Sequence, residues 1–328
     1  MIIKSIGVIG GGAWGTALAE TARRAGRDVV LWARSTDIVD EINRLHTNAR
    51  YVPGFTLDAG LVATTDLSAA AGCDVILLVT PAQQIRDVLA TLRQLIVPGT
   101  RIVLCAKGIE LATGHLLDQV LAEVIPGAIA AVLSGPGFAV DVVGGLPTAV
   151  TLACADPDTG RDLSEALGSR TFRPYWSSDL IGVQLGGAVK NVLAIAAGIV
   201  AGRELGASAS AALITRGFAE MRRFSDALGA RPETLMGLSG FGDVVLSCSS
   251  PKSRNFAHGL ALANPAKYGA LPARTTEGVL TAKAVTAIAR ARGIDVPVAN
   301  AVTAILAGTV TIEDAIAALL QRPLKAED

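Results

Sequence analysis

The sequence has few of the residues that bind metals or form disulfides. None of the three histidines has a second histidine at helical ligand spacing, and the four cysteines are far apart without a Cys-x-x-Cys pair; they are Cys73, Cys105, Cys154 and Cys248. Structural metal sites need closely spaced ligands, and disulfide frameworks need cysteines that can pair. We therefore expect free thiols, a cytoplasmic location and no metal site.

An excess of charge of either sign is missing, and so is a long apolar run. The 29 Lys and Arg residues balance the 29 Asp and Glu residues, which excludes binding to nucleic acid or anionic membranes through bulk charge. The most apolar segment, residues 192–201, is shorter than the ~20 residues of a membrane span and follows Lys190. We expect a buried helix there, no membrane span, and an N-terminal strand rather than a signal peptide.

The order of the apolar patterns predicts two domains of different class. With 328 residues and 51% hydrophobic content, the chain can bury two cores. Strand-like runs alternate with helical patterns at residues 2–9, 28–32, 75–79, 102–105, 130–133 and 149–153, which predicts a parallel, Rossmann-like doubly wound sheet of the α/β class. Later patterns are helical only. We expect a dinucleotide-binding domain over residues 1–182 and an all-α substrate domain over residues 183–328.

A glycine motif follows the first predicted strand and precedes a helical pattern. Gly10, Gly12 and Gly15 form Gly-x-Gly-x-x-Gly. The first glycine allows a tight turn, the second lets a pyrophosphate approach the backbone, and the third allows the helix to pack closely on the strand. A purely structural glycine turn is the alternative. In this strand-to-helix context we expect a bound dinucleotide, NADP(H) or NAD(H).

The end of the second predicted strand bears on the choice between these cofactors. A carboxylate at this position accepts hydrogen bonds from the ribose 2′-OH of NAD, but none lies between Asp28 and Asp37. Arg34 stands there instead and would meet a 2′-phosphate. We therefore predict that NADPH is bound at least as well as NADH. The alternative is that Arg34 is a solvated loop cation.

One lysine interrupts a helical segment that is otherwise small and apolar, residues 186–198. Burial disfavours the ammonium form and lowers the pKa of a lysine, which makes Lys190 a candidate proton donor and acceptor near neutral pH. A nearby carboxylate would oppose that shift. Alternatively, the stem of Lys190 packs in the interior while its head reaches water at the domain boundary.

Two later segments have the composition of a ligand site. Three glycines within residues 237–243 allow the backbone to turn sharply just before Asp243. Ser253, Arg254 and Asn255 open an apolar helical pattern, so backbone N–H groups and a guanidinium would point the same way and hold a dianion. An exposed helix start is the alternative.

Two loops follow predicted strands of the first domain. Lys107 comes after residues 102–105, and residues 134–139 come after the next strand. The carboxyl ends of parallel strands lie at the edge of the sheet where ligands bind, so we expect both loops to face the crevice between the domains. Plain turns are the alternative.

Taken together, these motifs resemble NAD(P)-dependent sn-glycerol-3-phosphate dehydrogenase of the bacterial type, from about residue 5 to residue 307. The matching segments are residues 10–19, 48–54, 107–110, 135–139, 190–191, 211–217, 237–243, 253–255 and 277–278. The resemblance implies reversible hydride transfer between dihydroxyacetone phosphate and sn-glycerol 3-phosphate, which supplies glycerophospholipid synthesis. It also implies a homodimer.

The resemblance assigns roles to individual residues. It makes Lys190 the proton acceptor in alcohol oxidation and the donor in ketone reduction, Asp243 the group that holds the charge and position of that lysine, and Lys107 a contact to cofactor and substrate. The implied cofactor-binding residues are Gly10, Gly12, Ala13, Trp14, Gly15, Arg34, Lys107, Ala139, Arg254 and Glu277, and the implied substrate-binding residues are Lys107, Gly135, Gly137, Lys190, Asp243, Ser253, Arg254 and Asn255.

The sequence departs from the family pattern near the substrate site. Gly137 stands where the family usually has serine, Asp141 where it has glutamate, and Ser247 where threonine is common. The hydroxyl is kept at Ser247, and the backbone N–H of Gly137 can replace the lost hydroxyl, so we keep Gly137 as a site residue.

Two other functions compete with this interpretation. A related 2-hydroxyacid- or ketopantoate-type NADP-dependent dehydrogenase can share the glycine motif and the lysine-asparagine pair, but it acts on a carboxylate. Residues 237–255 discriminate against it, because they suit a phosphorylated ketone. A non-catalytic nicotinamide sensor would lack the chemistry that Lys190, Asp243 and Arg254 supply.

Overall fold

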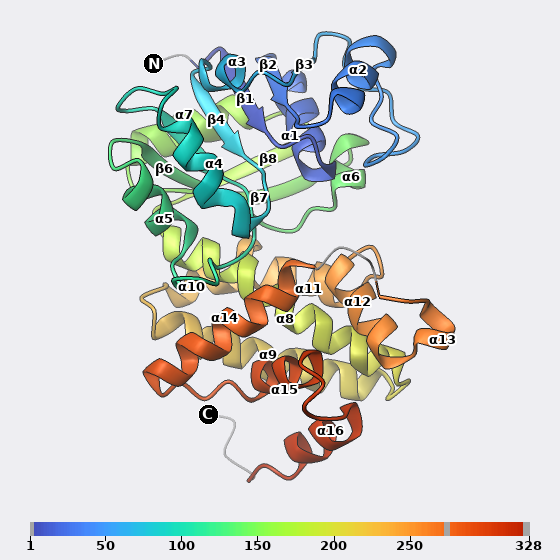
Figure 1. Ribbon diagram of the computed structural model, residues 1–328. Helices are drawn as coiled ribbons and strands as arrows, with labels where there is room; N and C mark the ends of the chain where they lie inside the picture. The colour runs from blue at the N-terminus through green and yellow to red at the C-terminus, as the bar shows by residue number, and fades with distance from the viewer. Residues whose placement is uncertain (1–2, 272–275, 324–328) are drawn as a thin grey trace.

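The chain folds into two units that meet at a crevice (Figure 1). The structure, a computed structural model, describes residues 3–271 and 276–323. In Figure 1 the sheet and its helices form the upper unit and the later helices form the lower one. Ile2, the predicted start of the first strand, lies outside the described residues.

The upper unit contains one sheet, with the strand order β3-β2-β1-β4-β5-β6-β7-β8. The two neighbours of β1 are β2 and β4, so successive crossovers leave β1 in opposite directions, which is where doubly wound sheets bind ligands. The strands are β1 (Ser5–Ile9), β2 (Asp28–Trp32), β3 (Val62–Thr64), β4 (Val75–Leu78), β5 (Arg101–Leu104), β6 (Ile129–Ser134), β7 (Thr148–Cys154) and β8 (Phe172–Ser177).

The sheet is mixed rather than wholly parallel. Every neighbouring pair among these strands is parallel except β6 and β7, so the expectation of a purely parallel sheet is wrong at that pair. The helix between them, α6 (Ala139–Val143), has five residues and spans about 7.5 Å, whereas the six residues of β6 span roughly 20 Å. It is too short to carry the chain back to the start of β6. The strands β3 and β8 were not predicted.

Helices cover both faces of the sheet, which makes three layers. Successive strand residues alternate between the layers: Val75 and Leu77 pack with one core cluster, and Ile76 and Leu78 with the other. The first cluster includes residues of α1, α2, α6 and α7, and the second includes residues of α3, α4 and α5. These helices are α1 (Ala13–Arg24), α2 (Thr36–Leu45), α3 (Leu67–Ala71), η1 (Ala82–Gln84), α4 (Ile85–Leu92), α5 (Leu117–Val124) and α7 (Pro157–Leu167), together with α6.

The lower unit is helical throughout its described residues, as predicted. β8 ends at Ser177 and α8 begins at Leu180, so the predicted boundary between residues 182 and 183 falls just inside α8; the division into domains stays a prediction. The elements are α8 (Leu180–Gly202), α9 (Ala207–Asp226), α10 (Pro232–Met236), the π-helical η2 (Leu238–Gly242), α11 (Asp243–Cys248), α12 (Arg254–Ala263), α13 (Pro265–Tyr268), α14 (Glu277–Arg292), α15 (Pro297–Leu306) and α16 (Ile312–Leu320).

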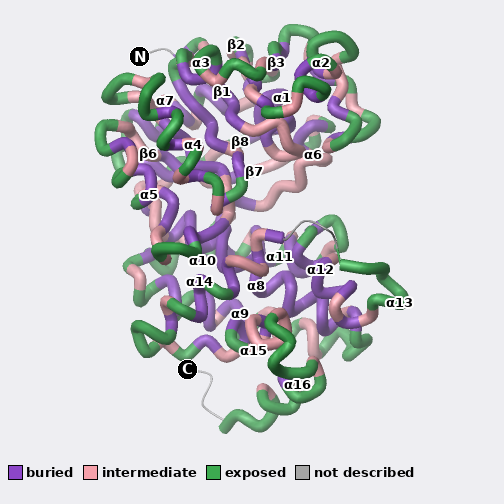
Figure 2. Tube along the Cα trace, in the orientation of Figure 1, coloured by how far each residue is buried: buried purple, intermediate pink, exposed green. Residues whose placement is uncertain are grey.

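The helix α8 is the core of the lower unit. Its length and composition would suffice to cross a membrane, but 94% of its apolar stretch is buried inside the protein. It packs against α9, α11, α12 and α14, so every face of the helix is covered by a neighbour and must be apolar. Figure 2 shows it buried along nearly its whole length. The prediction of a buried helix is confirmed, and the helix is longer than the predicted segment.

Two glycines let α8 and α12 approach more closely than side chains would allow. A Cβ at Gly259 would collide with the carbonyl oxygen of Ile195 and lie 2.9 Å from the Cα of Gly198, and a Cβ at Gly198 would collide with the carbonyl of Phe256. This crossing holds the first turn of α12 against the helix that carries Lys190.

We expect the substitution Gly259→Ala to destabilise the protein. Alanine normally favours a helix over glycine by up to about 1 kcal/mol, but here the added methyl meets backbone atoms that cannot move aside. The free energy of unfolding should fall by about 1–3 kcal/mol, measured by chemical denaturation. As a control, Ala318→Val at an exposed position of α16 should change it by less than about 1 kcal/mol. A Gly259→Ala protein as stable as the parent would contradict the close crossing.

Candidate active site

A cavity of about 840 Å³ lies at the carboxyl ends of β1, β4 and β5 and is closed from below by helices of the lower unit. Gly10 follows β1, Thr80 follows β4 and Cys105 follows β5, and all three line the cavity. From the lower unit, α8, α11, α12 and α14 each contribute residues. The two loops that the sequence analysis places at the crevice both line this cavity, with Lys107 after β5 and with Gly137 and Ala139 after β6.

The glycine motif forms the turn that the sequence predicts. Gly10 has φ of +131°, which disfavours any residue with a side chain, and a Cβ at Gly15 would collide with the carbonyl oxygen of Gly10. At Gly12, by contrast, a Cβ would meet no atom within 4 Å. Gly12 precedes α1, so the free backbone N–H groups of that helix start face the open side of the cavity.

Unpaired polar atoms in the cavity wall fit a bound dinucleotide. Trp14 Nε1, Thr80 Oγ1 and Glu277 Oε2 are buried and have no hydrogen-bond partner among the described residues, and all three residues line the cavity. Buried polar groups normally have partners, so such atoms indicate a ligand. Burial also raises the pKa of the Glu277 carboxyl, and the backbone N–H of Ala82 and the charge of Arg254 partly oppose this shift.

The cavity end beside β2 is cationic. Arg34 and Arg50 both line it, and the Arg50 guanidinium lies 5.6 Å from the centre of the Tyr51 ring. The carboxylates among the described lining residues are Asp243 and Glu277, which come from the lower unit. The described wall therefore provides no acid for a ribose 2′-OH at the end of β2, in agreement with the sequence.

A carboxylate between two lysines forms the most buried part of the site. Asp243, the first residue of α11, is 1% exposed, and its Oδ2 lies 2.6 Å from Lys107 Nζ. Its Oδ1 lies 3.1 Å from Lys190 Nζ and accepts a hydrogen bond of 3.1 Å from Ser247 Oγ. Lys190 Nζ in turn donates to Ser247 Oγ at 2.6 Å. Lys107 thus joins the upper unit to a carboxylate of the lower one, while Lys190 is buried, with 7% of its surface exposed.

The environment shifts the pKa of both partners in the pair. Burial lowers the pKa of Lys190 to about 8; Asp243 opposes this shift and the ammonium of Lys107 adds to it. Burial alone would raise the pKa of Asp243, but Lys107 and Lys190 outweigh it and hold that pKa below its usual value. Near neutral pH, Lys190 is therefore close to losing its proton while Asp243 stays ionised.

A chain of amide side chains holds these groups in place. Asn191 Nδ2 donates to the backbone carbonyl of Lys107 at 3.1 Å, and Asn255 Nδ2 donates to Asn191 Oδ1 at 2.8 Å. The oxygen of Asn255 accepts from the backbone N–H of Gly278 at 3.0 Å. This chain links β5, α8, α12 and α14 around the cavity.

The first turn of α12 forms the other end of the cavity. Ser253 is the N-cap, and its Oγ accepts from Phe256 N at 3.4 Å, so the helix begins where the sequence predicts. Arg254 is exposed on the first turn and lines the cavity. Beside it, Lys252 Nζ lies 3.1 Å from Asp141 Oδ1 on α6, which connects the two units across the crevice.

The structure brings together all but one of the residues predicted for the site. Gly135 does not line the cavity, although its carbonyl accepts from Lys107 Nζ at 2.8 Å and its φ is +144°. The predicted residues that line it are Gly10, Gly12, Ala13, Trp14, Gly15, Arg34, Lys107, Gly137, Ala139, Lys190, Asp243, Ser253, Arg254, Asn255 and Glu277.

Sequence reasoning missed several polar residues of the wall, among them Thr80, Arg50 and Lys252. Thr80 directly follows the predicted strand at residues 75–79, and Arg50 lies within the matching segment at residues 48–54, so a signal for both was present. Lys252 precedes Ser253 by one residue, but nothing in the sequence places it opposite Asp141.

A doubly wound sheet with an open helix start at its switch point, facing a lysine ready to exchange a proton, defines an NAD(P)-dependent oxidoreductase. Family models agree with this class. Residues 5–160 match the model of the NAD-dependent glycerol-3-phosphate dehydrogenase N-terminus, and residues 179–317 match that of its C-terminus. The chain belongs to the NAD-dependent glycerol-3-phosphate dehydrogenase family and is an oxidoreductase.

Individual relatives cover the whole chain. The glycerol-3-phosphate dehydrogenase (NAD(P)+) of Parvibaculum lavamentivorans is 55% identical over 99% of this chain and 98% of its own length. That of Caulobacter vibrioides is 53% identical and covers 100% of both chains. The crystal structure of glycerol-3-phosphate dehydrogenase from Coxiella burnetii is 39% identical, with a TM-score of 0.91 over 98% of this chain and 100% of that one.

The alternative class of reductase shares the fold. A ketopantoate reductase from Ralstonia eutropha has a TM-score of 0.60 over 92% of this chain and 97% of that chain, with 16% identity. At that identity the likeness shows the fold alone. The full-length family match separates this chain from the keto-acid reductases.

We expect the substitution Gly12→Ala to weaken dinucleotide binding without unfolding the protein. The new methyl group meets no protein atom within 4 Å and stands on the open side of the helix start, where a pyrophosphate would approach. The Kd for NADPH, measured by fluorescence titration, should rise at least about tenfold, while the Tm stays within a few degrees of the parent. Unchanged NADPH affinity in a folded Gly12→Ala protein would contradict this placement.

Proposed function

We propose that the chain catalyses the reversible reduction of dihydroxyacetone phosphate to sn-glycerol 3-phosphate with NADPH or NADH. The observation that carries the proposal is the buried lysine pair on Asp243, which shares one cavity with the glycine turn and with Arg254. The named activity of the full-length relatives supports it.

We assign the proton transfer to Lys190. When bound, the nicotinamide supplies the hydride in reduction and accepts it in oxidation. As hydride reaches the carbonyl carbon, negative charge develops on the oxygen, and the Lys190 ammonium stabilises it and then donates its proton. Asp243 keeps that ammonium oriented, and Ser247 fixes its position through the 2.6 Å hydrogen bond. Lys107 provides a second positive charge beside the reacting oxygen.

We assign phosphate binding to the start of α12. Ser253, Arg254 and Asn255 present a hydroxyl, a guanidinium and backbone N–H groups at a helix N-terminus, a combination that suits a dianion. Holding the remote phosphate keeps the carbonyl carbon near the nicotinamide, so binding energy lowers the barrier through orientation.

Gly137 suits the aromatic wall beside it. A Cβ at this position would lie 3.3 Å from Thr148 Cγ2 and 3.4 Å from the Trp14 ring, so a serine would require these neighbours to give way slightly. We infer that the backbone N–H of Gly137 takes over the contact to substrate. Ala139, at the start of α6, would lie against the cofactor.

We further propose that NADPH is used at least as well as NADH, because Arg34 and Arg50 stand where a 2′-phosphate would lie and no carboxylate of the described wall competes there.

A cytoplasmic location, a role in supplying glycerophospholipid synthesis and a homodimer also remain proposals. Phe241 on η2 and Val245 on α11 are exposed apolar residues that a second copy could cover.

The direct test of the function is the loss of NADPH or NADH absorbance when the purified protein is mixed with dihydroxyacetone phosphate. Rapid oxidation supports the proposed reaction and ranks the two cofactors. A different outcome would overturn the proposal: the folded protein binds NADPH and oxidises neither cofactor with dihydroxyacetone phosphate, but it oxidises one of them with a keto acid. The protein would then be a keto-acid reductase.

The pH dependence should report the titration of Lys190. In reduction the protonated lysine donates, so kcat/KM for dihydroxyacetone phosphate should be high below pH 8 and fall as the pH rises through about 8. In oxidation the neutral lysine accepts, so the rate should rise over the same range. Lys190→Ala should lose roughly 10²–10⁴-fold in kcat and this pH dependence, whereas Lys283→Ala at an exposed lysine of α14 should keep both. A pH profile unchanged by Lys190→Ala would remove this residue from the proton transfer.

The substitution Arg254→Ala should affect the phosphorylated substrate selectively. A lost charged hydrogen bond costs about 1.5–3 kcal/mol, so the KM for dihydroxyacetone phosphate should rise by roughly 10- to 100-fold. The rate with unphosphorylated dihydroxyacetone should stay nearly the same. Arg290→Ala, an exposed arginine of α14, serves as the control. An equal loss with both ketones would show that Arg254 does not bind the phosphate.

A further inference from the structure

We propose that the ion pair between Arg86 and Glu110 positions Lys107 for the reaction. Arg86 and Glu110 do not line the cavity themselves and act through Lys107, so they are positioning residues. The inference rests on the proposed function for its kinetic consequences. Its structural content, the placement of Lys107 against Asp243, can be measured without turnover.

The loop that carries Lys107 is long and reaches across the crevice. It connects β5, which ends at Leu104, to α5, which begins at Leu117. Near its start, the Lys107 ammonium makes the ion pair of 2.6 Å to Asp243 in the other unit. Two backbone hydrogen bonds fix a turn later in the loop, from Gly114 N–H to the Glu110 carbonyl at 2.9 Å and from Glu110 N–H to the His115 carbonyl at 3.0 Å. They lie beyond Lys107, so its position depends on what anchors this turn to the rest of the protein.

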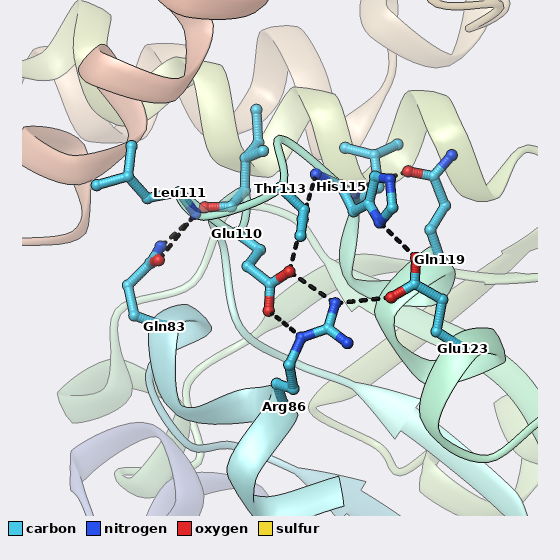
Figure 3. Close-up of polar contacts among 10 residues, drawn as sticks. Gln83, Arg86, Glu110, Leu111, Thr113, His115, Gln119 and Glu123 are labelled. Atoms are coloured by element: carbon cyan, nitrogen blue, oxygen red, sulfur yellow. Dashed lines mark hydrogen bonds and ion pairs between the residues drawn. The ribbon is translucent and has the colours of Figure 1, made fainter.

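Glu110 provides such an anchor three residues beyond Lys107. The residue is 6% exposed, and its two oxygens accept hydrogen bonds of 2.8 Å each from Nε and Nη2 of Arg86. Thr113 Oγ1, within the same loop, donates to it at 2.6 Å. Figure 3 shows the guanidinium of Arg86 on α4 facing this buried carboxylate. A bidentate pair fixes the direction of the carboxylate as well as its distance.

A second side chain of the same helical segment clamps the backbone on either side of Glu110. Gln83 donates from Nε2 to the carbonyl of Ile109 at 2.8 Å and accepts from the N–H of Leu111 at 2.9 Å (Figure 3). Gln83 therefore holds the backbone at Ile109 and Leu111, and Arg86 holds the side chain of Glu110 between them. They extend from η1 and α4, which directly follow β4 at the cavity edge.

The same segment also touches the other unit. The backbone N–H of Ala82 donates to Glu277 Oε1 at 3.2 Å, while Asn191 Nδ2 holds the backbone carbonyl of Lys107 from α8. The loop that carries Lys107 is thus held by a hydrogen bond from α8 at Lys107 itself and by the ion pair from α4 at Glu110. If one of these contacts is lost, Lys107 can move away from Asp243.

Movement of Lys107 away from Asp243 should change the pKa of Lys190 in a direction that distinguishes it from a general loss of stability. The charged or titratable groups that face Lys190 are Asp243 and Cys248 from α11 and Lys107 from the β5 loop. Lys107 lowers the pKa of Lys190, so its departure should raise that pKa above about 8. Removal of the negative charge of Glu110 would by its direct field shift the pKa in the opposite direction. An upward shift therefore reports the movement of Lys107.

The test uses two variants and a matched control in the full-length protein. Glu110→Gln presents an amide N–H₂ to the guanidinium, and Arg86→Lys keeps the charge but loses the bidentate fork. The control Glu123→Gln removes the second carboxylate of Arg86, which lies 2.8 Å away on α5 and is 43% exposed. It also changes the 2.8 Å contact to His115 at the far end of the loop, but it leaves the pair of Arg86 with Glu110 in place. The Lys190 pKa is followed by NMR titration of ¹³C-lysine-labelled protein, assigned with Lys190→Arg, and kcat/KM for dihydroxyacetone phosphate is measured from pH 6.5 to 10.

In Glu110→Gln and Arg86→Lys we expect kcat/KM to fall about tenfold and the Lys190 titration to move upward by at least roughly half a pH unit. Glu123→Gln should stay within about twofold of the parent with an unshifted titration. If Glu110→Gln does not fold, Arg86→Lys decides alone. A Lys190 titration that stays in place or moves downward in these variants overturns the proposal, whatever the activity does. If the parent itself does not reduce dihydroxyacetone phosphate, the proposed function fails, while the NMR titration still decides the positioning of Lys107.

Discussion

The buried carboxylate of Asp243 between the ammonium groups of Lys107 and Lys190 is the interaction on which the rest of the structure depends. A charge that is 1% exposed is tolerated only with partners, and removal of one partner from such a buried pair typically costs about 3–5 kcal/mol. The two lysines come from different units, one from the loop after β5 and one from α8. The same electrostatic need that keeps Asp243 ionised therefore also holds the sheet unit against the helical unit.

This arrangement leaves Lys190 in a narrow range of protonation. Full burial without Asp243 would make the lysine neutral, and a single exposed carboxylate partner would leave it permanently charged. The combination of burial, one carboxylate and a second ammonium brings its pKa to about 8. The apolar surroundings of α8, built from small residues so that α12 can pack closely, supply the burial. A pKa in this range suits the proton transfer that we propose for Lys190 in either direction of the reaction.

Much of the site could be predicted because its parts are local. The glycine turn of Gly10, Gly12 and Gly15, the N-cap at Ser253 and the isolated Lys190 each carry their signal within a few residues. The polar groups that depend on long-range packing could not be predicted in the same way. The ion pair of Lys252 with Asp141 joins residues 111 positions apart. The ion pair of Arg86 with Glu110 depends on how α4 packs beside the loop after β5. Likewise, the antiparallel β7 follows from the short α6, which no apolar periodicity reveals.

By itself, the sequence determined the class of fold, the glycine turn and the lack of an acid at the end of β2, and it predicted which residues move a proton or hold an anion. These features follow from backbone conformation and side-chain chemistry, which are properties of short segments. Only the tertiary structure decided that Lys190 is buried rather than snorkelling, that Gly135 lies behind the cavity wall, and that Lys107 bridges the two units. Burial and charge pairing are set by what packs around a residue, and in this protein most of those neighbours are distant in the sequence.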